Sequence, residues 1–275
     1  MILYKLVFGA IRNVKREEAT DFIESYISAL MHNGQACGEY VTVLQENKLC
    51  AYVTMQGVKA NTMKAHSKWG KKWLIEIEKT FGCSPSWELI DDELPKRDED
   101  WKNTPFIYLS TNLNDFGSPI RKGSNGKSIP MYIIPGEHED RESIYFWQRA
   151  YKNHDSIWMM CGELEIPTYK QLATPSSELS VNGRKICAYI EKVTGVPTFY
   201  YLMRFWGRRN NEKDRKCPGC GEDWAIKSSY DDADSSFHKF DFSCDPCRLV
   251  SHVSSASDDE RHAVIGEWRE LKNMA

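Results

Sequence analysis

The chain has 275 residues, of which 41% are hydrophobic and 27% are charged, with a formal net charge of -3. This composition excludes a disordered chain, and the length favours about two or three folded modules. The acidic balance excludes a globally basic nucleic-acid-binding protein, so any attraction to phosphate must be local. The apolar runs are short and the N-terminus lacks a secretory signal, so we expect a cytoplasmic protein with no membrane partner.

The first part of the chain alternates between strand-like and helical patterns. Apolar spacing typical of a strand or a helix covers, in order, residues 2–8, 19–30, 39–45, 49–56, 63–81 and 87–90. The polar stretch 46–48 suits a hairpin between the two central strands. The resulting order β-α-β-β-α-β predicts a ferredoxin-like domain over residues 1–93, within an α+β protein.

A second block, residues 104–206, follows an acidic stretch around Pro95 that is typical of a linker. Expected strands and helices in this block cover residues 106–110, 131–134, 141–151 and 181–193. Asn125-Gly126 is a strong turn signal between the two strands. The last helix is expected to end at Gly195, because glycine readily adopts the left-handed conformation that closes helices. We therefore predict a mixed α+β middle domain.

Two Cys-x-x-Cys turns near the C-terminus predict a zinc ribbon. The four expected ligands are Cys217, Cys220, Cys244 and Cys247. The 23 residues between the two turns leave room for a hairpin that brings both thiolate pairs together. A thioredoxin-like redox pair is the rival interpretation, but such a pair does not come with a matched second pair. Four thiolates complete a tetrahedron, so we predict one structural zinc ion.

The ribbon and a terminal helix are expected to fill residues 213–275. Expected strands lie at 224–229, 239–243 and 248–253, and the expected helix covers residues 258–272 with Ser257 or Asp258 as its cap. Enzyme motifs are lacking. Residues 123–128 resemble the end of a P-loop, but Arg121 replaces the first glycine and Pro130 opposes the helix that should follow. We therefore expect no enzymatic activity.

The segment that leads into the ribbon, residues 204–216, combines basic and aromatic side chains. The residues expected to contact nucleic acid are Arg204, Phe205, Trp206, Arg208, Arg209, Arg215 and Lys216. Cations that contact phosphate beside rings that stack on bases are the two components of single-strand recognition. In the alternative interpretation, the segment is a linker whose aromatic residues complete the middle domain. The lysine-rich second helix, residues 63–81, is a further basic face.

Three segments carry a family resemblance: GRKICAYIEKVTGVPTFYYLMRFWG, CPGCGEDW and FSCDPCRLVS. In these segments the chain resembles an uncharacterised bacterial family described as zinc-ribbon-containing proteins with a suggested nucleic-acid-binding role. The resemblance implies zinc binding at the four cysteines and supplies no established activity.

Two hypotheses on function follow from these patterns. In the first, a non-enzymatic cytoplasmic zinc-ribbon protein binds RNA or DNA, with segment 204–216 contacting phosphate and Phe205 or Trp206 stacking on a base. In the second, the chain is a protein-binding module, for example an antitoxin or immunity protein that neutralises a toxin partner. The acidic net charge and the multi-module organisation favour this second hypothesis.

Overall fold

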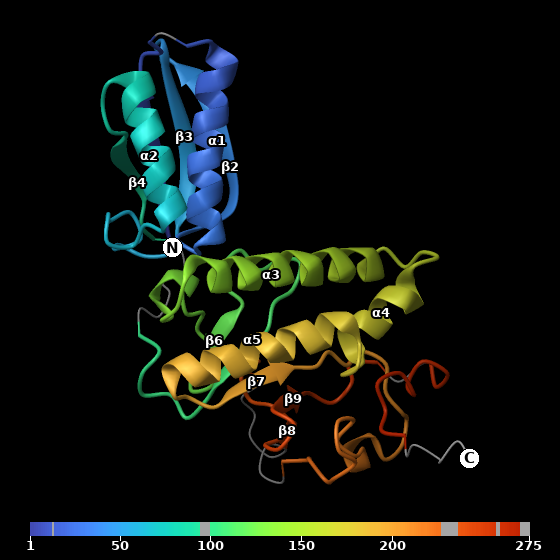
Figure 1. Ribbon diagram of the computed structural model, residues 1–275. Coiled ribbons are helices and arrows are strands. Elements are labelled where there is room, and N and C mark those ends of the chain that lie inside the picture. Colours follow the sequence, from blue (N-terminus) through green and yellow to red (C-terminus); the bar gives the residue numbers. More distant parts are fainter. Residues whose placement is uncertain (13, 94–99, 227–235, 257–258, 270–275) are drawn as a thin grey trace, which may run out of the picture. The chain divides into compact units, whose positions relative to one another are not determined.

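The computed structural model describes the chain except for residues 13, 94–99, 227–235, 257–258 and 270–275 (Figure 1). The described residues form two compact units. Unit 1 contains residues 1–101, 115–119 and 127–146, and unit 2 contains residues 102–114, 120–126 and 147–275. The mixed α+β class expected from the sequence is confirmed.

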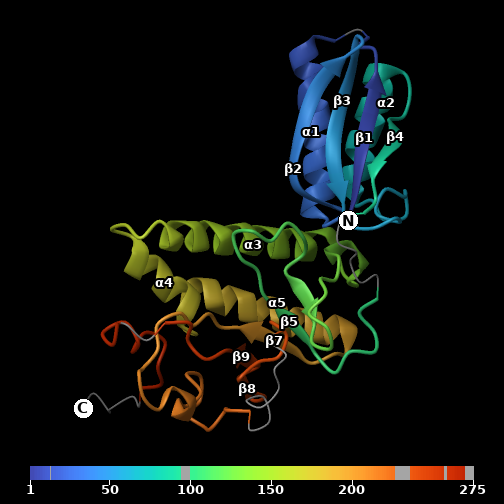
Figure 2. The ribbon, with the colours of Figure 1, turned by 180° about the vertical axis from the view of Figure 1, so that it is seen from behind.

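Unit 1 is built around a four-stranded antiparallel sheet with two helices packed on one face (Figures 1 and 2). Its elements are β1 (Ile2–Gly9), α1 (Arg16–His32), β2 (Ala36–Gln45), β3 (Lys48–Met55), α2 (Lys68–Phe81) and β4 (Ser86–Asp91). The strand order is β2-β3-β1-β4. Leu6 and Phe8 of β1 are fully buried against the helices, because alternate strand residues point to the same face of the sheet.

Local sequence accounts for the boundaries of these elements. Glu46 and Asn47 both have positive φ, at 49° and 64°, which is the geometry of a two-residue hairpin turn. The Ser67 hydroxyl begins α2 by accepting a hydrogen bond from the Gly70 amide at 3.2 Å. Gly82 ends the helix at φ 70°, a conformation that glycine adopts without steric cost.

Unit 2 contains a five-stranded mixed sheet in the order β6-β5-β7-β9-β8. Its elements are β5 (Ile107–Leu109), β6 (Ile120–Lys122), α4 (Glu165–Ala173), α5 (Glu178–Thr194), β7 (Thr198–Tyr201), the 3-10 helix η2 (Glu212–Asp214), β8 (Phe242–Cys244) and β9 (Leu249–Ser251). α3 (His138–Met159) contributes residues to both units. The central strand β7 pairs in parallel with both β5 and β9. One sheet therefore contains strands from the expected middle domain and from the expected ribbon.

The two faces of the second sheet bury different side chains. On one face, Tyr200 of β7 is fully buried and packs against Trp147 with ring centroids 6.1 Å apart. On the other face lies an aromatic cluster, in which Tyr108 and Phe240 are 5.0 Å apart and Phe106 and Phe199 are 5.5 Å apart. Both faces of the sheet therefore contribute to the core of unit 2.

Two expected elements differ in the structure, and one helix was not expected. Residues 131–133 form the 3-10 helix η1 (Met131–Ile133) and not a strand, because β6 already pairs with β5 and a proline precedes the segment. Residues 260–266 form turns and not a helix, because Gly266 has a φ of 72° that interrupts helical geometry. The expected cap at 257–258 and residues 270–272 lie outside the described residues. α4 was not predicted.

None of the helices in the described ranges is both long and apolar enough to cross a membrane. α5 ends at Gly195, as its sequence predicts.

The contact between α5 and β7 predicts a packing-sensitive position at Gly183. A Cβ atom there would overlap the Tyr200 ring and lie 2.9 Å from Trp147 Nε1. We expect Gly183→Ala to lower the free energy of unfolding by about 1–2 kcal/mol, because overpacking outweighs the better helix propensity of alanine. Urea unfolding measures this change, with Gly162→Ala as a control because no atom lies within 4 Å of its added Cβ. Equal stability of the two variants would contradict the expected clash.

Candidate metal centre

The four predicted cysteines converge in unit 2. The sulfur atoms of Cys217, Cys220, Cys244 and Cys247 all lie within 4.8 Å of one another. The first pair belongs to a turn before Trp224; in the second pair, Cys244 is the last residue of β8 and Cys247 lies in the loop between β8 and β9. The antiparallel β8-β9 hairpin thus places one pair, while the first turn is held against it by stacking of Trp224 on Phe242 at 4.9 Å.

Glycine residues permit the close approach of the two turns. A Cβ atom on Gly219 would lie 2.7 Å from the sulfur of Cys247, so this position has no room for a side chain. The Gly219 amide donates a hydrogen bond to the Cys217 sulfur at 3.4 Å. Gly221 closes the turn at φ 80°, and its amide donates to the Cys217 carbonyl at 2.8 Å.

The sulfur positions fit a tetrahedral metal ion. Bonds of about 2.3 Å in a tetrahedron place sulfur atoms about 3.8 Å apart. Cys220 and Cys244 are 3.6 Å apart, which is far longer than the roughly 2.05 Å of a disulfide. Cys217 and Cys244 are buried, while Cys220 and Cys247 are half-buried. Four soft thiolates at this spacing could hold one metal ion.

The surroundings of the thiols couple metal binding to proton release. Burial raises the pKa of the Cys247 thiol to about 12 and raises the pKa of Cys217 well above its ordinary value. By contrast, a hydrogen bond from the Glu222 amide is the main cause of a lowered pKa at Cys220. Because metal ions bind the thiolate form, loading the centre must displace protons, and metal affinity falls as the pH falls.

Segment 204–216 contributes mainly to the interior of unit 2. Trp206 is 7% exposed and packs edge-to-face on Tyr169 at 4.4 Å. The Tyr169 hydroxyl accepts hydrogen bonds from the amides of Phe205 at 2.8 Å and Trp206 at 3.3 Å. The Phe205 ring is half-buried and lies 5.0 Å from the Trp158 ring. The two aromatic residues therefore pack against α3 and α4, which is the placement expected if they complete the core.

Two arginines of the segment are buried. Arg215 contacts Glu212 at 2.6 Å and Glu267 at 2.7 Å, and it donates to the Ala263 carbonyl at 2.6 Å. Arg204 is 6% exposed, and burial lowers the pKa of its guanidinium to about 10. Arg204 also donates to the Gly266 carbonyl at 3.4 Å, so both arginines anchor the turns at residues 260–266 and are not available to phosphate.

The other basic residues of the segment have acidic partners. Arg208 pairs with Glu267 at 2.7 Å, Arg209 lies 3.9 Å from Glu260, and Lys216 pairs with Asp223 at 2.7 Å. The seven residues expected to contact nucleic acid therefore do not form one open basic surface. The sequence showed their charges but not the carboxylates, which approach from residues up to 59 positions away.

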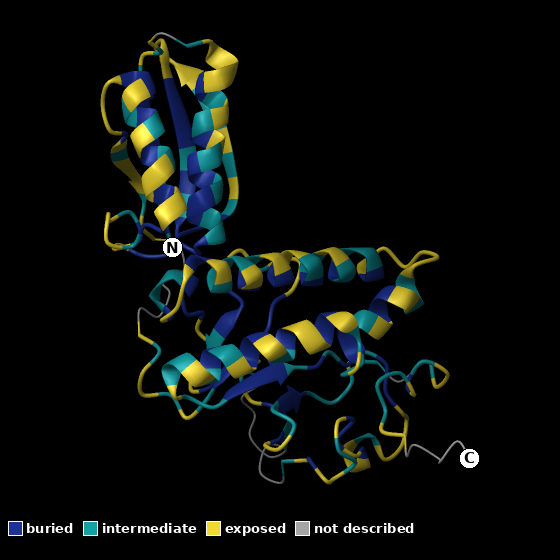
Figure 3. Cartoon of the chain, viewed as in Figure 1, coloured by how far each residue is buried: buried dark blue, intermediate teal, exposed yellow. Residues whose placement is uncertain are grey.

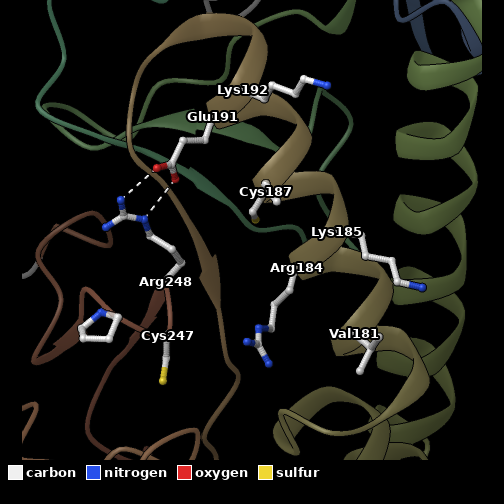
Figure 4. Close-up of a pocket in the computed structure, with 10 residues that line it drawn as sticks. Val181, Arg184, Lys185, Cys187, Glu191, Lys192, Cys247 and Arg248 are labelled. Carbon is white, nitrogen blue, oxygen red and sulfur yellow. Dashed lines mark hydrogen bonds and ion pairs between the residues drawn. The ribbon is translucent and has the colours of Figure 1, made fainter.

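A second concave site, which the sequence interpretation missed, adjoins the metal centre (Figure 4). It is a cleft of about 690 Å³ between α5 and the second cysteine turn. Its lining residues are Val181, Arg184, Lys185, Cys187, Ala188, Glu191, Lys192, Pro246, Cys247 and Arg248. The signal that could have revealed it is the set of basic residues on α5, Arg184, Lys185 and Lys192.

Three family models and two uncharacterised bacterial proteins are similar to this chain. Three family models match, each described as a domain of unknown function: DUF8589 over residues 1–91, DUF2310 over 102–203 and DUF8594 over 207–257. One uncharacterised protein of Haemophilus influenzae is 38% identical over 185 residues, which are 66% of this chain and 68% of the relative. A second from the same organism is 38% identical over 173 residues, or 61% of this chain and 81% of the relative.

The chain therefore belongs to a family of uncharacterised bacterial proteins that includes these two relatives. No solved structure matches it.

The buried arginine cluster predicts a large difference between two arginines of the same segment. Removing Arg215, whose side chain is 2% exposed, leaves Glu212 and Glu267 without their shared buried partner. We expect Arg215→Ala to lower the free energy of unfolding by about 3–5 kcal/mol. Arg209→Ala should change it by less than about 1 kcal/mol, because that side chain is 70% exposed. Chemical denaturation of both variants tests the difference, and equal losses would refute the structural role of Arg215.

Proposed function

We propose that this protein is a non-enzymatic nucleic-acid-binding protein whose C-terminal part is a structural zinc ribbon. Tetrahedral four-sulfur sites are typical of zinc or of iron–sulfur centres. Two short cysteine turns that converge on a single point, the second of them between the antiparallel strands β8 and β9, favour one zinc ion. With four thiolate ligands, zinc has no position for water or substrate, so its proposed role is to stabilise the fold.

Elemental analysis tests the identity of the metal. We expect about one zinc ion per chain in protein prepared without chelator. Cys220→Ser should abolish zinc retention, because it removes one of the four ligands. Cys161→Ser is the control, since that exposed thiol lies outside the cluster. Metal-free wild-type protein, or iron in place of zinc, would contradict the proposed ribbon.

We also propose that residues 1–91 adopt a ferredoxin-like arrangement. The element order β-α-β-β-α-β and the strand order β2-β3-β1-β4 support it. Both helices pack on the same face of this sheet. The outward face of α2 is thereby exposed to solvent (Figure 3).

The observation that best supports nucleic-acid binding is the arrangement of tryptophan and lysine residues on α2. Trp69 is a large aromatic residue with 41% of its surface exposed. The Lys72 ammonium lies 5.1 Å from the centre of the Trp69 ring and 5.1 Å from the centre of the Trp73 ring. The Lys68 ammonium lies 5.8 Å from the Trp69 ring and also pairs with Glu139.

This face has the chemistry of a single-strand binding surface. A base can stack on an exposed aromatic ring while adjacent cations contact the phosphates on either side. Within the described ranges, Lys64, Lys71 and Lys72 form no ion pair with a carboxylate, so their charges are not offset locally. Such a surface attracts nucleic acid even though the chain as a whole is acidic.

Binding of a labelled single-stranded oligonucleotide at low salt tests this proposal. Trp69→Ala should weaken binding roughly 5- to 150-fold, which corresponds to the loss of about 1–3 kcal/mol of stacking. The double variant Lys71→Gln/Lys72→Gln should bind less salt-dependently. The slope of log affinity against log salt concentration should fall by about one for each lost phosphate contact. The matched control is Lys79→Gln, also on α2, whose ammonium pairs with Glu76 at 2.7 Å.

Two results would refute nucleic-acid binding through α2. One is the absence of binding by the wild-type protein at low salt. The other is equal affinity of the Trp69→Ala and Lys79→Gln variants.

A protein partner is the second candidate function, and exposed apolar residues on the edge strands of unit 1 favour it. Val41 and Leu44 on β2, together with Leu89 and Ile90 on β4, are between 44% and 57% exposed. Edge strands can pair with a strand of another protein, as a toxin neutralised by an antitoxin or immunity protein would require. Recovery of one protein partner after nuclease treatment, with no oligonucleotide binding, would favour this candidate over the first.

A further inference from the structure

The cleft between α5 and the second cysteine turn has an excess of positive charge. Its lining includes four cations, Arg184, Lys185, Lys192 and Arg248, against one carboxylate, Glu191. The carboxylate is already engaged, because Arg248 contacts it through Nε at 3.0 Å and Nη2 at 2.8 Å. This guanidinium is also the main cause of the lowered pKa of Glu191. The charge of Glu191 is therefore offset by Arg248.

The remaining cations of the cleft have no such ion pair with any described residue. Neither Arg184, Lys185 nor Lys192 forms an ion pair within the part of the chain that the structure describes. Arg184 is half-buried, and Figure 4 shows it extending from α5 beside Cys247, while Lys185 and Lys192 extend from the other side of the helix. Three cations along the α5 wall of one cleft, on a protein that is acidic overall, favour an anionic ligand.

Both walls of the cleft are held in place. On α5, Gly183 packs directly against the Tyr200 ring, which fixes the rotation of the helix and hence the direction of Arg184. On the opposite wall, the Arg248 carbonyl accepts a hydrogen bond from the Tyr200 amide at 2.8 Å. The Arg248 guanidinium lies 5.3 Å from the centre of the Phe199 ring. Arg248 is therefore a positioning residue that ties the cysteine turn to α5.

We infer that this cleft binds the phosphate backbone of a single-stranded nucleic acid, with Arg184 as the inner phosphate contact and Lys185 and Lys192 at the rim. This assignment rests on the proposed nucleic-acid binding and adds a second contact surface to the one on α2. Arg184 and Lys192 are separated by two helical turns, about 12 Å along the axis, which exceeds the reach of a single phosphate ion. The apolar residues Val181, Ala188 and Pro246 leave room for sugar or base between the cations.

The metal centre forms part of this site. Cys247 lies in the wall of the cleft, and the adjacent Arg248 has a φ of 49°, a conformation that the turn must maintain. Loss of the ion that the four thiolates would hold is expected to release this wall. Nucleic-acid binding through the cleft should therefore require the metal-loaded protein.

A competing role for Arg184 is to offset the negative charge of the thiolates. Four thiolates around one divalent ion carry a formal charge of about -2. Under this alternative, loss of Arg184 would weaken metal retention and leave nucleic-acid affinity unchanged in the loaded protein. Measurement of both quantities separates the two roles.

The experiment uses the full-length, metal-loaded protein and a labelled single-stranded oligonucleotide over a range of salt concentrations. Arg184→Gln and Lys192→Gln should each lower affinity and reduce the salt slope by about one. Lys216→Gln is the matched control, because it also removes one positive charge from unit 2, but one whose ammonium pairs with Asp223 at 2.7 Å. Retention of metal is measured for each variant with a chromogenic chelator.

Each outcome either supports or overturns the assignment. A reduced slope in Arg184→Gln with unchanged metal retention and an unaffected Lys216→Gln supports it. If wild-type protein binds and Trp69→Ala weakens binding, but Arg184→Gln behaves like Lys216→Gln, the cleft assignment fails and the proposed function stands. Absence of wild-type binding removes both. Displacement of the oligonucleotide by inorganic phosphate at equal phosphate concentration would overturn it in favour of a free-phosphate site.

Discussion

The parallel pairing of β7 with β9 is the constraint on which the organisation of unit 2 depends. The amides of Tyr200 and Leu202 donate to carbonyls of Arg248 and Val250 at 2.8 and 2.9 Å, so the strand after the second cysteine turn continues the sheet that α5 covers. A zinc ribbon can be an independent small domain, whose few apolar residues depend on the metal. Here the hairpin that carries the second cysteine turn shares a sheet with the segment before it, which places that turn beside α5 and creates the cleft next to Cys247.

Charged residues serve two different purposes in this protein. In the segment before the ribbon, Arg204 and Arg215 are buried, and Arg215 is surrounded by Glu212, Glu267 and a backbone carbonyl. A buried cation is tolerated only when such partners offset its desolvation, so the acidic residues near the C-terminus are needed for the fold. These ion pairs remove a basic stretch from the surface that would otherwise be the first candidate for phosphate contact.

On α2 and α5, in contrast, several cations, among them Lys72, Arg184 and Lys192, form no ion pair among the described residues. Trp69 and Lys72 on α2 combine an exposed ring with a cation, and Arg184 and Lys192 on α5 line a cleft. Positive charge is therefore unevenly distributed over the protein, although the net charge is -3. Attraction to a polyanion depends on the local potential within about 10 Å at moderate salt, and not on the total charge.

The sequence by itself determined the features that depend on local spacing. Two Cys-x-x-Cys turns indicated which cysteines converge, and alternating or helical apolar patterns indicated the elements of residues 1–91 and the end of α5 at Gly195. Only the tertiary structure decided which strands pair, which arginines are buried and which carboxylates they contact. Glu267, whose carboxylate pairs with Arg208, is 59 positions away in the sequence, and no local sequence pattern predicts such a contact. Short-range periodicity indicates which secondary structure a segment can form. Strand pairing and side-chain burial depend instead on the free energy of the whole fold.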